Sequence, residues 1–245
     1  NIKCRKSGLQ PALTVLVATT QGLKMHGGVP VEEIKQPNPQ GLKEGLRNLD
    51  RHIANLQSFG QTVVVCFNRF ATDTDEEISF CRQHCNDIGV GFAVNNAFNE
   101  GGSGAEELAR LVVETIDTKP SAPLHFTYPD ESGVEEKALA VCRTIYGADG
   151  VTFSPQAKKM IERIKELGVT HYPICIAKTQ YSFSADAKAY GCPTGFNIHI
   201  RDIVVNCGAE MLVLIAGDIM RMPGLPRSPQ AERIDLVDGE IVGLS

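Results

Sequence analysis

Three short apolar runs, each followed by a polar loop and an amphipathic helix, constrain the fold of this chain more than any other feature. The runs at 13–18 and 62–67 are rich in β-branched residues, and the third, at 91–94, is shorter. Apolar residues at steps of three and four predict a helix over 39–59. This alternation predicts an α/β fold with a parallel sheet, flanking helices on both faces, and 13–18 and 62–67 as inner strands.

The segment 119–123, Lys-Pro-Ser-Ala-Pro, ends this alternation. Two prolines among small residues terminate the preceding helix and mark a connection. The sequence therefore predicts two domains, with residues 1–120 in a parallel-sheet domain and residues 121–245 in a smaller α/β domain. In the second domain we expect short helices at 133–146 and 155–167, and strands at 150–153, 196–205 and 211–216.

Composition excludes several classes of protein. A net charge of −5 argues against a nucleic-acid partner, and no apolar run reaches the length of a membrane span. The eight cysteines are scattered without a C-x-x-C pair, which is typical of reduced thiols and predicts a cytoplasmic protein. Cys81, His84 and Cys85 share one helical face but lack a fourth ligand, so no metal site is predicted.

The loops after the first two strands carry chemically useful groups. In open parallel sheets, ligands bind beyond the carboxyl ends of the strands. The loop 21–28 contains Lys-Met-His-Gly-Gly at 24–28, which offers a cation and a backbone that a ligand can approach, although the glycines could serve only the turn. After the second strand, Asn68 could hydrogen-bond a ring edge. Asp73 could bind a metal, a ring nitrogen or a ribose, or cap the next helix.

Two phenylalanines follow consecutive strands. Phe70 lies in the second loop, and Phe98 lies in the third, 95–104. Because consecutive strands are usually neighbours, both rings are expected at the same edge of the sheet. Two aromatic rings across a crevice would hold a flat heterocycle. The alternative is that both rings pack beneath their own loops.

Other segments qualify this interpretation. The chain has no Gly-Lys dipeptide and no dinucleotide fingerprint, so it does not hold nucleotide phosphates with a phosphate loop. The run 174–184 passes from an apolar strand into Lys-Thr-Gln-Tyr-Ser-Phe-Ser, more hydrogen-bonding groups than a turn requires. We expect this run either to brace the two domains or to contact a ligand.

Several stretches together resemble formate–tetrahydrofolate ligase, also called formyltetrahydrofolate synthetase. They occur in the family's order and are residues 17–19 with 23–28, 48–53, 70–74, 177–184 and 219–226. The resemblance covers only the C-terminal portion of such an enzyme. It implies part of a P-loop NTPase-like domain lacking its phosphate loop, which would lie upstream, and the chain begins at Asn1 rather than Met.

The family reaction joins formate to N10 of tetrahydrofolate with ATP hydrolysis, through formyl phosphate. The resemblance thus implies formate, tetrahydrofolate and ATP as substrates, magnesium as a cofactor, and self-association of the full-length enzyme. It places Phe70 and Phe98 at the family's paired aromatics, which sandwich a pterin or adenine ring. The other predicted site residues come from the strand-end loops: Lys24 and His26 as catalytic groups, and Asn68, Asp73, Gly27, Gly28, Gly101 and Gly102 as binding groups.

Three positions depart from the family pattern. Phe98 stands where tryptophan is frequent, Ala185 replaces a carboxylate, and Arg221 replaces a small hydroxyl residue. A smaller ring at 98 reduces the stacking area but keeps the mode of binding. Without the phosphate loop the chain alone is expected to be inactive as a ligase. The alternative hypothesis is a stand-alone folate- or nucleotide-binding module without catalysis.

Overall fold

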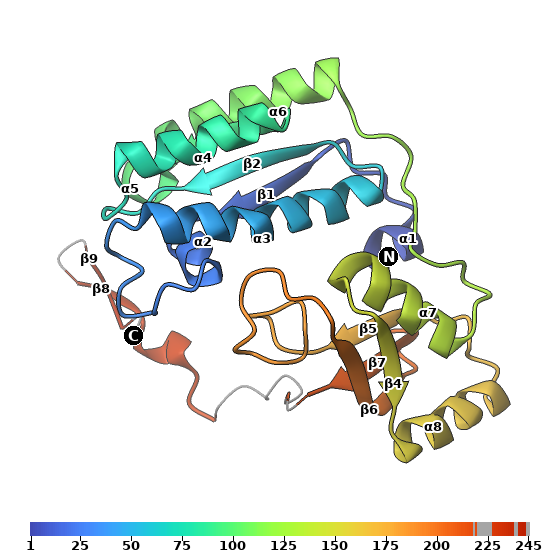
Figure 1. The fold of residues 1–245 in the computed structure, drawn as a ribbon. Helices are drawn as coiled ribbons and strands as arrows, with labels where there is room; N and C mark the ends of the chain where they lie inside the picture. Colours follow the sequence, from blue (N-terminus) through green and yellow to red (C-terminus); the bar gives the residue numbers. More distant parts are fainter. Residues whose placement is uncertain (218, 220–226, 238–239, 244–245) are drawn as a thin grey trace.

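The chain forms two separate sheets with flanking helices, and a small antiparallel hairpin near its end (Figure 1). The computed structural model describes residues 1–217, 219, 227–237 and 240–243. The hairpin joins β8 (Asp235–Val237) to β9 (Glu240–Val242) and follows the 3₁₀ helix η3 (Gln230–Arg233). Arg221 and the Pro/Gly segment 222–226 lie outside the described residues.

The first sheet is parallel, in the order β1 (Thr14–Ala18), β2 (Val63–Asn68), β3 (Gly91–Asn95). The predicted α/β fold is confirmed for this half. Helices α3 (Pro39–Ser58) and α4 (Asp75–Asp87) cover one face, where they share a core with alternate residues of β2. Helix α6 (Glu106–Thr118) lies over the other face at β3. Since β2 is central, Val63 to Phe67 are all buried, as expected for an inner parallel strand.

The prediction that 13–18 is an inner strand is wrong for the described chain. Strand β1 pairs with β2 alone among the described strands, so it forms an edge. Val15 and Val17 of β1 are 39% and 55% exposed. They lie on the same face of the sheet as α6, but α6 covers that face at β3 and leaves it open at β1. An apolar, β-branched run identifies a strand, but it does not reveal how many neighbours that strand has.

The prediction of a loop at 21–28 is also wrong. Residues Thr20–His26 form helix α2, and Thr19 caps it by accepting the Gly22 N–H at 3.0 Å. The glycines that suggested a loop allow close packing on α3 instead. A Cβ at Gly45 of α3 would overlap the carbonyl of Leu23, and one at Gly27 would overlap the carbonyl of Gly41. Tertiary packing therefore overrides the low helix propensity of glycine here.

The second sheet is mixed, in the order β4 (Gly150–Phe153), β6 (Asn197–Asn206), β7 (Met211–Ala216), β5 (Ile174–Ala177). Within this sheet the β6–β7 pair is antiparallel, and the β4–β6 and β5–β7 pairs are parallel. Helices α7 (Val134–Val141) and α8 (Pro155–Glu166) pack on it, and a π-helical turn (Cys142–Tyr146) extends α7 to the predicted end at 146.

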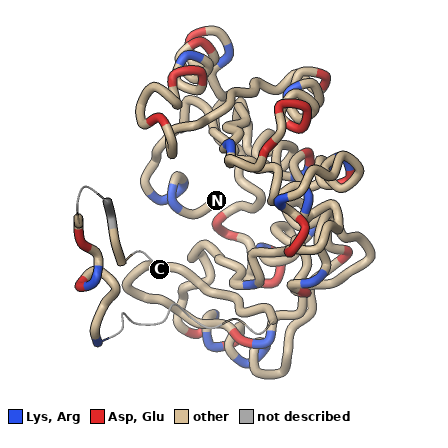
Figure 2. The backbone as a smooth tube through the Cα atoms, turned by 90° about the vertical axis from the view of Figure 1, so that its left-hand side faces the viewer, with Lys and Arg blue, Asp and Glu red and all other residues tan. Residues whose placement is uncertain are grey.

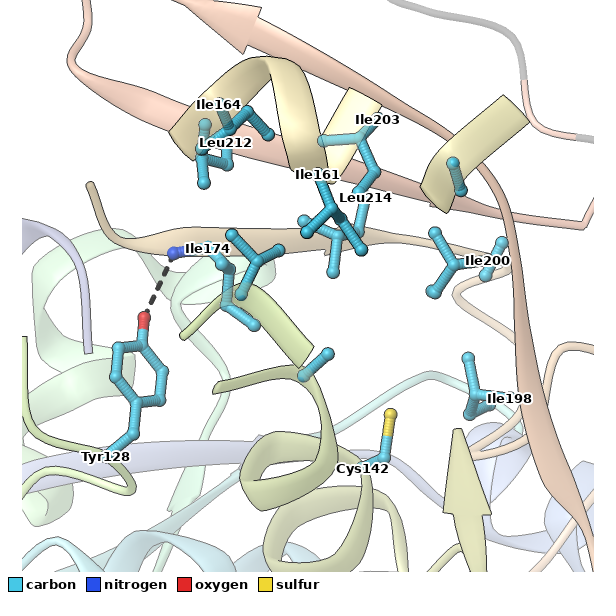
Figure 3. Close-up of a cluster of buried hydrophobic side chains, with 14 of the residues drawn as sticks. Tyr128, Cys142, Ile161, Ile164, Ile174, Ile198, Ile200, Ile203, Leu212 and Leu214 are labelled. Atoms are coloured by element: carbon cyan, nitrogen blue, oxygen red, sulfur yellow. Dashed lines mark hydrogen bonds between the residues drawn. The ribbon is translucent and has the colours of Figure 1, made fainter. Parts of the chain in front are cut away.

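The core of this second unit is closed. Figure 3 shows Ile161 and Ile164 of α8 beside Ile200, Ile203 and Leu214 of the sheet. These side chains are at most 3% exposed. Tyr128 closes one end, and its hydroxyl accepts the Ile174 N–H at 3.0 Å. The helices and the sheet of this unit therefore bury their apolar faces against one another.

The chain crosses between the two units twice. Helix α1 (Lys3–Ser7) is bonded to the second unit, because Arg5 pairs with Asp130 and Lys6 with Glu210. The chain then enters β1, and returns after α6. The two crossings are hydrogen-bonded side by side, with Ser121 N donating to Ala12 O at 2.8 Å and Gln10 Nε2 to Ala122 O at 2.9 Å.

Charged residues of both signs are interspersed along the backbone in the view of Figure 2, which agrees with the modest net charge of −5. None of the helices in the described ranges is both long and apolar enough to cross a membrane.

Candidate functional site

A cavity of about 670 Å³ lies beyond the carboxyl ends of β2 and β3. The two strands end at Asn68 and Asn95, which are partners in register, and Asn95 Nδ2 donates to Asn68 Oδ1 at 2.8 Å. Phe70 and Phe98 also line this cavity. The structure thus brings three of the expected site residues, Asn68, Phe70 and Phe98, to one place at the sheet edge.

Both phenylalanine rings are accessible. Phe98 lies on the short helix α5 (Ala97–Glu100) and is 97% exposed, and Phe70 is 42% exposed. Neither ring is packed beneath its loop. Apolar surface of this kind, with amide groups beside it, suits a flat ring that carries hydrogen-bonding atoms at its edge.

Asp73 holds the Phe70 loop rather than lining the cavity. Its side chain is buried, accepts the Phe70 N–H at 2.9 Å, and accepts a hydrogen bond from the hydroxyl of Thr20 in α2. The cap of α4 is Thr74, which accepts the Glu77 N–H at 3.2 Å. Asp73 is therefore a positioning residue that fixes the backbone carrying Phe70 against α2.

Lys24 lies away from the cavity, in a buried ion pair. Its Nζ is 3.0 Å from Glu77 Oε1 and donates to the carbonyl of Gln36 at 2.9 Å. Asn38 N donates to the same carboxylate oxygen at 3.2 Å. Because both charged side chains are at most 4% exposed, removing one partner would leave the other charge buried and unpaired. This pair ties α2 to α4.

The four glycines among the predicted site residues fall into two groups. Gly27 packs against α3, whereas Gly28 has a φ of +87° and open space beside it. Gly101 and Gly102 are exposed in the 3₁₀ helix η1 (Gly101–Ala105) that follows α5, with open space where a Cβ would stand. Gly101 has a φ of +61°, which a residue with a side chain rarely adopts.

A second cavity, of about 260 Å³, lies between the two units. His26 of α2, His52 of α3 and Lys178 after β5 line it. The units are joined around it, since Asn48 Nδ2 donates to Gly191 O at 2.7 Å and Asn55 Nδ2 to Ile145 O at 2.8 Å. We call this space the junction cleft. The run 178–184 therefore lies where it can brace the two units, and it also lines a cavity, so both expectations for it stay open.

Burial shifts the pKa values of the groups in the junction cleft. Lys178 donates to the carbonyls of Thr179 and Ser182, its Nζ lies 4.6 Å from the centre of the Tyr146 ring, and desolvation lowers its pKa to about 8. Desolvation, then the nearby His26 and Lys178, lowers the pKa of His52. Burial raises the pKa of Tyr146 to about 12. Each shift favours the neutral form of the group.

Sequence reasoning missed the junction cleft and one residue of the sheet-edge cavity. Asn95 could have been found from strand register, because it ends the third strand as Asn68 ends the second. The cleft residues His52 and Asn48 belong to α3 and meet a loop more than 120 positions away. No local pattern in the sequence carries that contact.

No group of three or more His, Cys, Asp or Glu side chains in the described ranges is placed to hold a metal ion. Cys81 and Cys85 are fully buried, and burial raises their thiol pKa values to about 12 and about 11. The Nε2 atom of His84 lies 2.7 Å from Oδ1 of Asp50, so this ring pairs with a carboxylate.

The fold and the sheet-edge cavity define the class of protein: an open α/β protein with a ligand-sized cavity at the carboxyl ends of its parallel strands. Comparison of the whole sequence identifies the family. Residues 1–245 match the formate–tetrahydrofolate ligase family, and the chain belongs to it.

Individual relatives agree. The chain is 64% identical to formate–tetrahydrofolate ligase of Bacteroides thetaiotaomicron, 60% to that of Parabacteroides distasonis and 57% to that of Porphyromonas gingivalis. Each match covers 100% of this chain and 44% of the relative. The chain thus spans less than half the length of these relatives.

Proposed function

We propose that this chain is the C-terminal part of a formate–tetrahydrofolate ligase, which formylates tetrahydrofolate at N10 with ATP through formyl phosphate. Family membership and the 44% share of the relatives' length support this proposal. The ring of pterin or adenine enters the sheet-edge cavity between Phe70 and Phe98, and the Asn68–Asn95 pair meets its edge. The observation that carries this role is the exposure of both rings at one strand-end cavity.

The parallel sheet is proposed to be part of a larger, P-loop NTPase-like sheet that the remaining length of the protein completes. The exposed Val15 and Val17 and the unpaired edge of β1 support this extension. The proposed domain boundary remains at 119–123, between residues 1–120 and 121–245, because the two sheets have separate cores. Helix α1 is the exception, since it is bonded to the second unit.

Magnesium and the phosphates of ATP are proposed to bind through the part of the protein that this chain does not include. The described residues offer no cluster suited to a metal ion. No catalytic step is therefore assigned to a metal through these residues. The 245-residue chain alone is expected to show no formate-dependent ATP hydrolysis, and measurable hydrolysis by it would contradict that expectation.

Ring binding can be tested by calorimetric titration of tetrahydrofolate and of ATP into the full-length protein. Phe70→Ala and Phe98→Ala should each weaken binding of at least one ligand by about 1 kcal/mol or more, the scale of one aromatic stacking contact. Phe80→Ala is the matched control, because Phe80 is 41% exposed on α4, similar to Phe70, but lines a different cavity. Unchanged binding in both test variants would refute the ring-binding role.

A further inference from the structure

We propose that the junction cleft binds a small oxyanion, a phosphate or carboxylate group, held by Lys178, His52 and His26. This site is separate from the sheet-edge cavity, and its test does not depend on the proposed function. The cleft of about 260 Å³ is smaller than the roughly 300–1,000 Å³ of pockets for drug-sized ligands, so a small ligand fits it best.

The charge of the lining favours an anion. Lys178, His52 and His26 all line the cleft, and among the described residues no Asp or Glu does. Of the other titratable groups on the elements around it, Arg51 donates to Thr144 O at 2.9 Å, Lys24 is paired with Glu77, and Cys142 and Tyr146 are neutral at physiological pH. A wall that carries an ammonium group and imidazole rings but no carboxylate is complementary to an anion.

The hydrogen-bonding state of His26 also favours an acceptor ligand. Gly191 N donates to His26 Nδ1 at 3.1 Å, so Nδ1 accepts and the proton of the neutral ring is on Nε2. The edge of the ring therefore offers an N–H donor. Tyr190 packs on this ring edge to face, at a centroid distance of 6.1 Å, and helps to fix its orientation.

Lys178 retains donor capacity. Its ammonium group has three protons, and the carbonyls of Thr179 and Ser182 accept two of them. These two bonds fix the position of Nζ at the wall of the cleft. The His52 side chain is only partly covered there, and the centre of its ring lies 4.7 Å from that of Phe183. An oxyanion can thus accept from Lys178 and His52 without displacing a bond between the two units.

Binding at this place would connect the units. His26 and His52 belong to the parallel-sheet unit, and Lys178 belongs to the mixed-sheet unit. A bound oxyanion adds charge-assisted hydrogen bonds from both, which are the stronger class of hydrogen bond. It also favours the protonated forms of Lys178 and His52, whose pKa values are lowered in its absence.

The test uses inorganic phosphate as the probe and the pKa of the His52 imidazole, followed by NMR, as the readout. Phosphate should raise this pKa relative to chloride at equal ionic strength. Lys178→Met should weaken phosphate binding by about tenfold, the loss expected for one charge-assisted contact. Lys188→Met is the control, because Lys188 is an exposed lysine of the same loop.

A second arm replaces phosphate with acetate. A similar rise in the His52 pKa extends the site to carboxylates, whereas no rise restricts it to phosphate, and either result upholds an oxyanion site. If Lys178→Met does not fold, His52→Gln should weaken binding several-fold, measured by calorimetry. An unchanged His52 pKa in both anions, or wild-type affinity in the folded variants, overturns the proposal.

Discussion

Helices α6 and α8 are both amphipathic, but only α8 buries its apolar residues. In α8, Ala157, Ile161 and Ile164 are at most 3% exposed. None of the 13 residues of α6 is buried, and Val113 is 59% exposed. The same contrast holds for the sheets, because β6 and β7 meet a closed core while β1 exposes two valines. Amphipathicity thus shows which face of an element seeks a partner, but not whether this chain supplies it.

The largest expected effect comes from truncating a buried side chain of the second unit, and an exposed valine of the first unit is the comparison. Leu214→Ala in the closed core should lower the free energy of unfolding by about 2–5 kcal/mol. Val17→Ala on β1 should change it by less than about 0.5 kcal/mol in this chain, because that side chain is already exposed. Denaturant titration of both variants measures the difference.

The stability of the Val17→Ala variant of the full-length protein tests whether the exposed face of β1 is covered there. If the sheet is extended there, Val17 becomes buried, and Val17→Ala should cost about 1–2 kcal/mol. An effect as small as that in the 245-residue chain would argue that nothing covers this face of β1.

An effect smaller than that of Leu214→Ala is expected at the contact between α2 and α3. Gly45→Ala places a methyl group on the carbonyl of Leu23 and should destabilise the parallel-sheet unit by about 1–3 kcal/mol. Gly102→Ala is the control, since it has open space and an ordinary φ. Thermal unfolding followed by circular dichroism compares them, and equal melting temperatures would show that α2 can move away from α3.

Asp73→Ala tests how the parallel-sheet unit holds Phe70. Loss of the acceptor for the Phe70 N–H and the Thr20 hydroxyl should cost about 1–2 kcal/mol of stability. Amide hydrogen exchange should also accelerate at Phe70. Thr72→Ala, at an exposed position of the same loop, is the control. Protection of the Phe70 amide equal to that in the wild type would mean that Asp73 does not position the loop.

The junction between the units should make stability depend on pH. Lys178 has a pKa of about 8 in the folded chain, below its ordinary value near 10.5. Between these values the unfolded chain binds the proton and the folded chain does not, so stability rises with pH. The stability of the wild type relative to that of Lys178→Met should therefore rise from pH 7 to pH 10 in chloride buffer. A constant difference would show that the environment of Lys178 does not disfavour its charge.

Local patterns were sufficient where an element is buried by near neighbours. The runs that became β2 and α3 could be assigned because continuous or periodic apolar residues reflect burial directly. The helix α2 could not, because its glycines fit the surface of α3 and only the folded packing reveals that use. The edge position of β1 could not be predicted either, because it depends on which other strands pair with β1, and the sequence of β1 itself does not encode that.

The residues of the candidate site also fall into those that the sequence predicts and those that it does not. Phe70 and Phe98 were brought to one cavity by strand order, which follows from consecutive parallel strands. The burial of Lys24 depends on Glu77, 53 positions away, and the pairing of Asp73 with Thr20 spans the same separation. Such contacts are decided by how helices dock on the sheet, which a single sequence does not specify.

The paired crossings at residues 10–12 and 121–124 have a mechanical consequence. A single connecting strand would let the two units swivel freely, but two strands bonded side by side form a ribbon. A ribbon of two bonded strands resists torsion more than one strand does, so this connection limits rotation of one unit against the other. Proteolytic cleavage of either crossing should leave the units associated, and separation should require that both be cut.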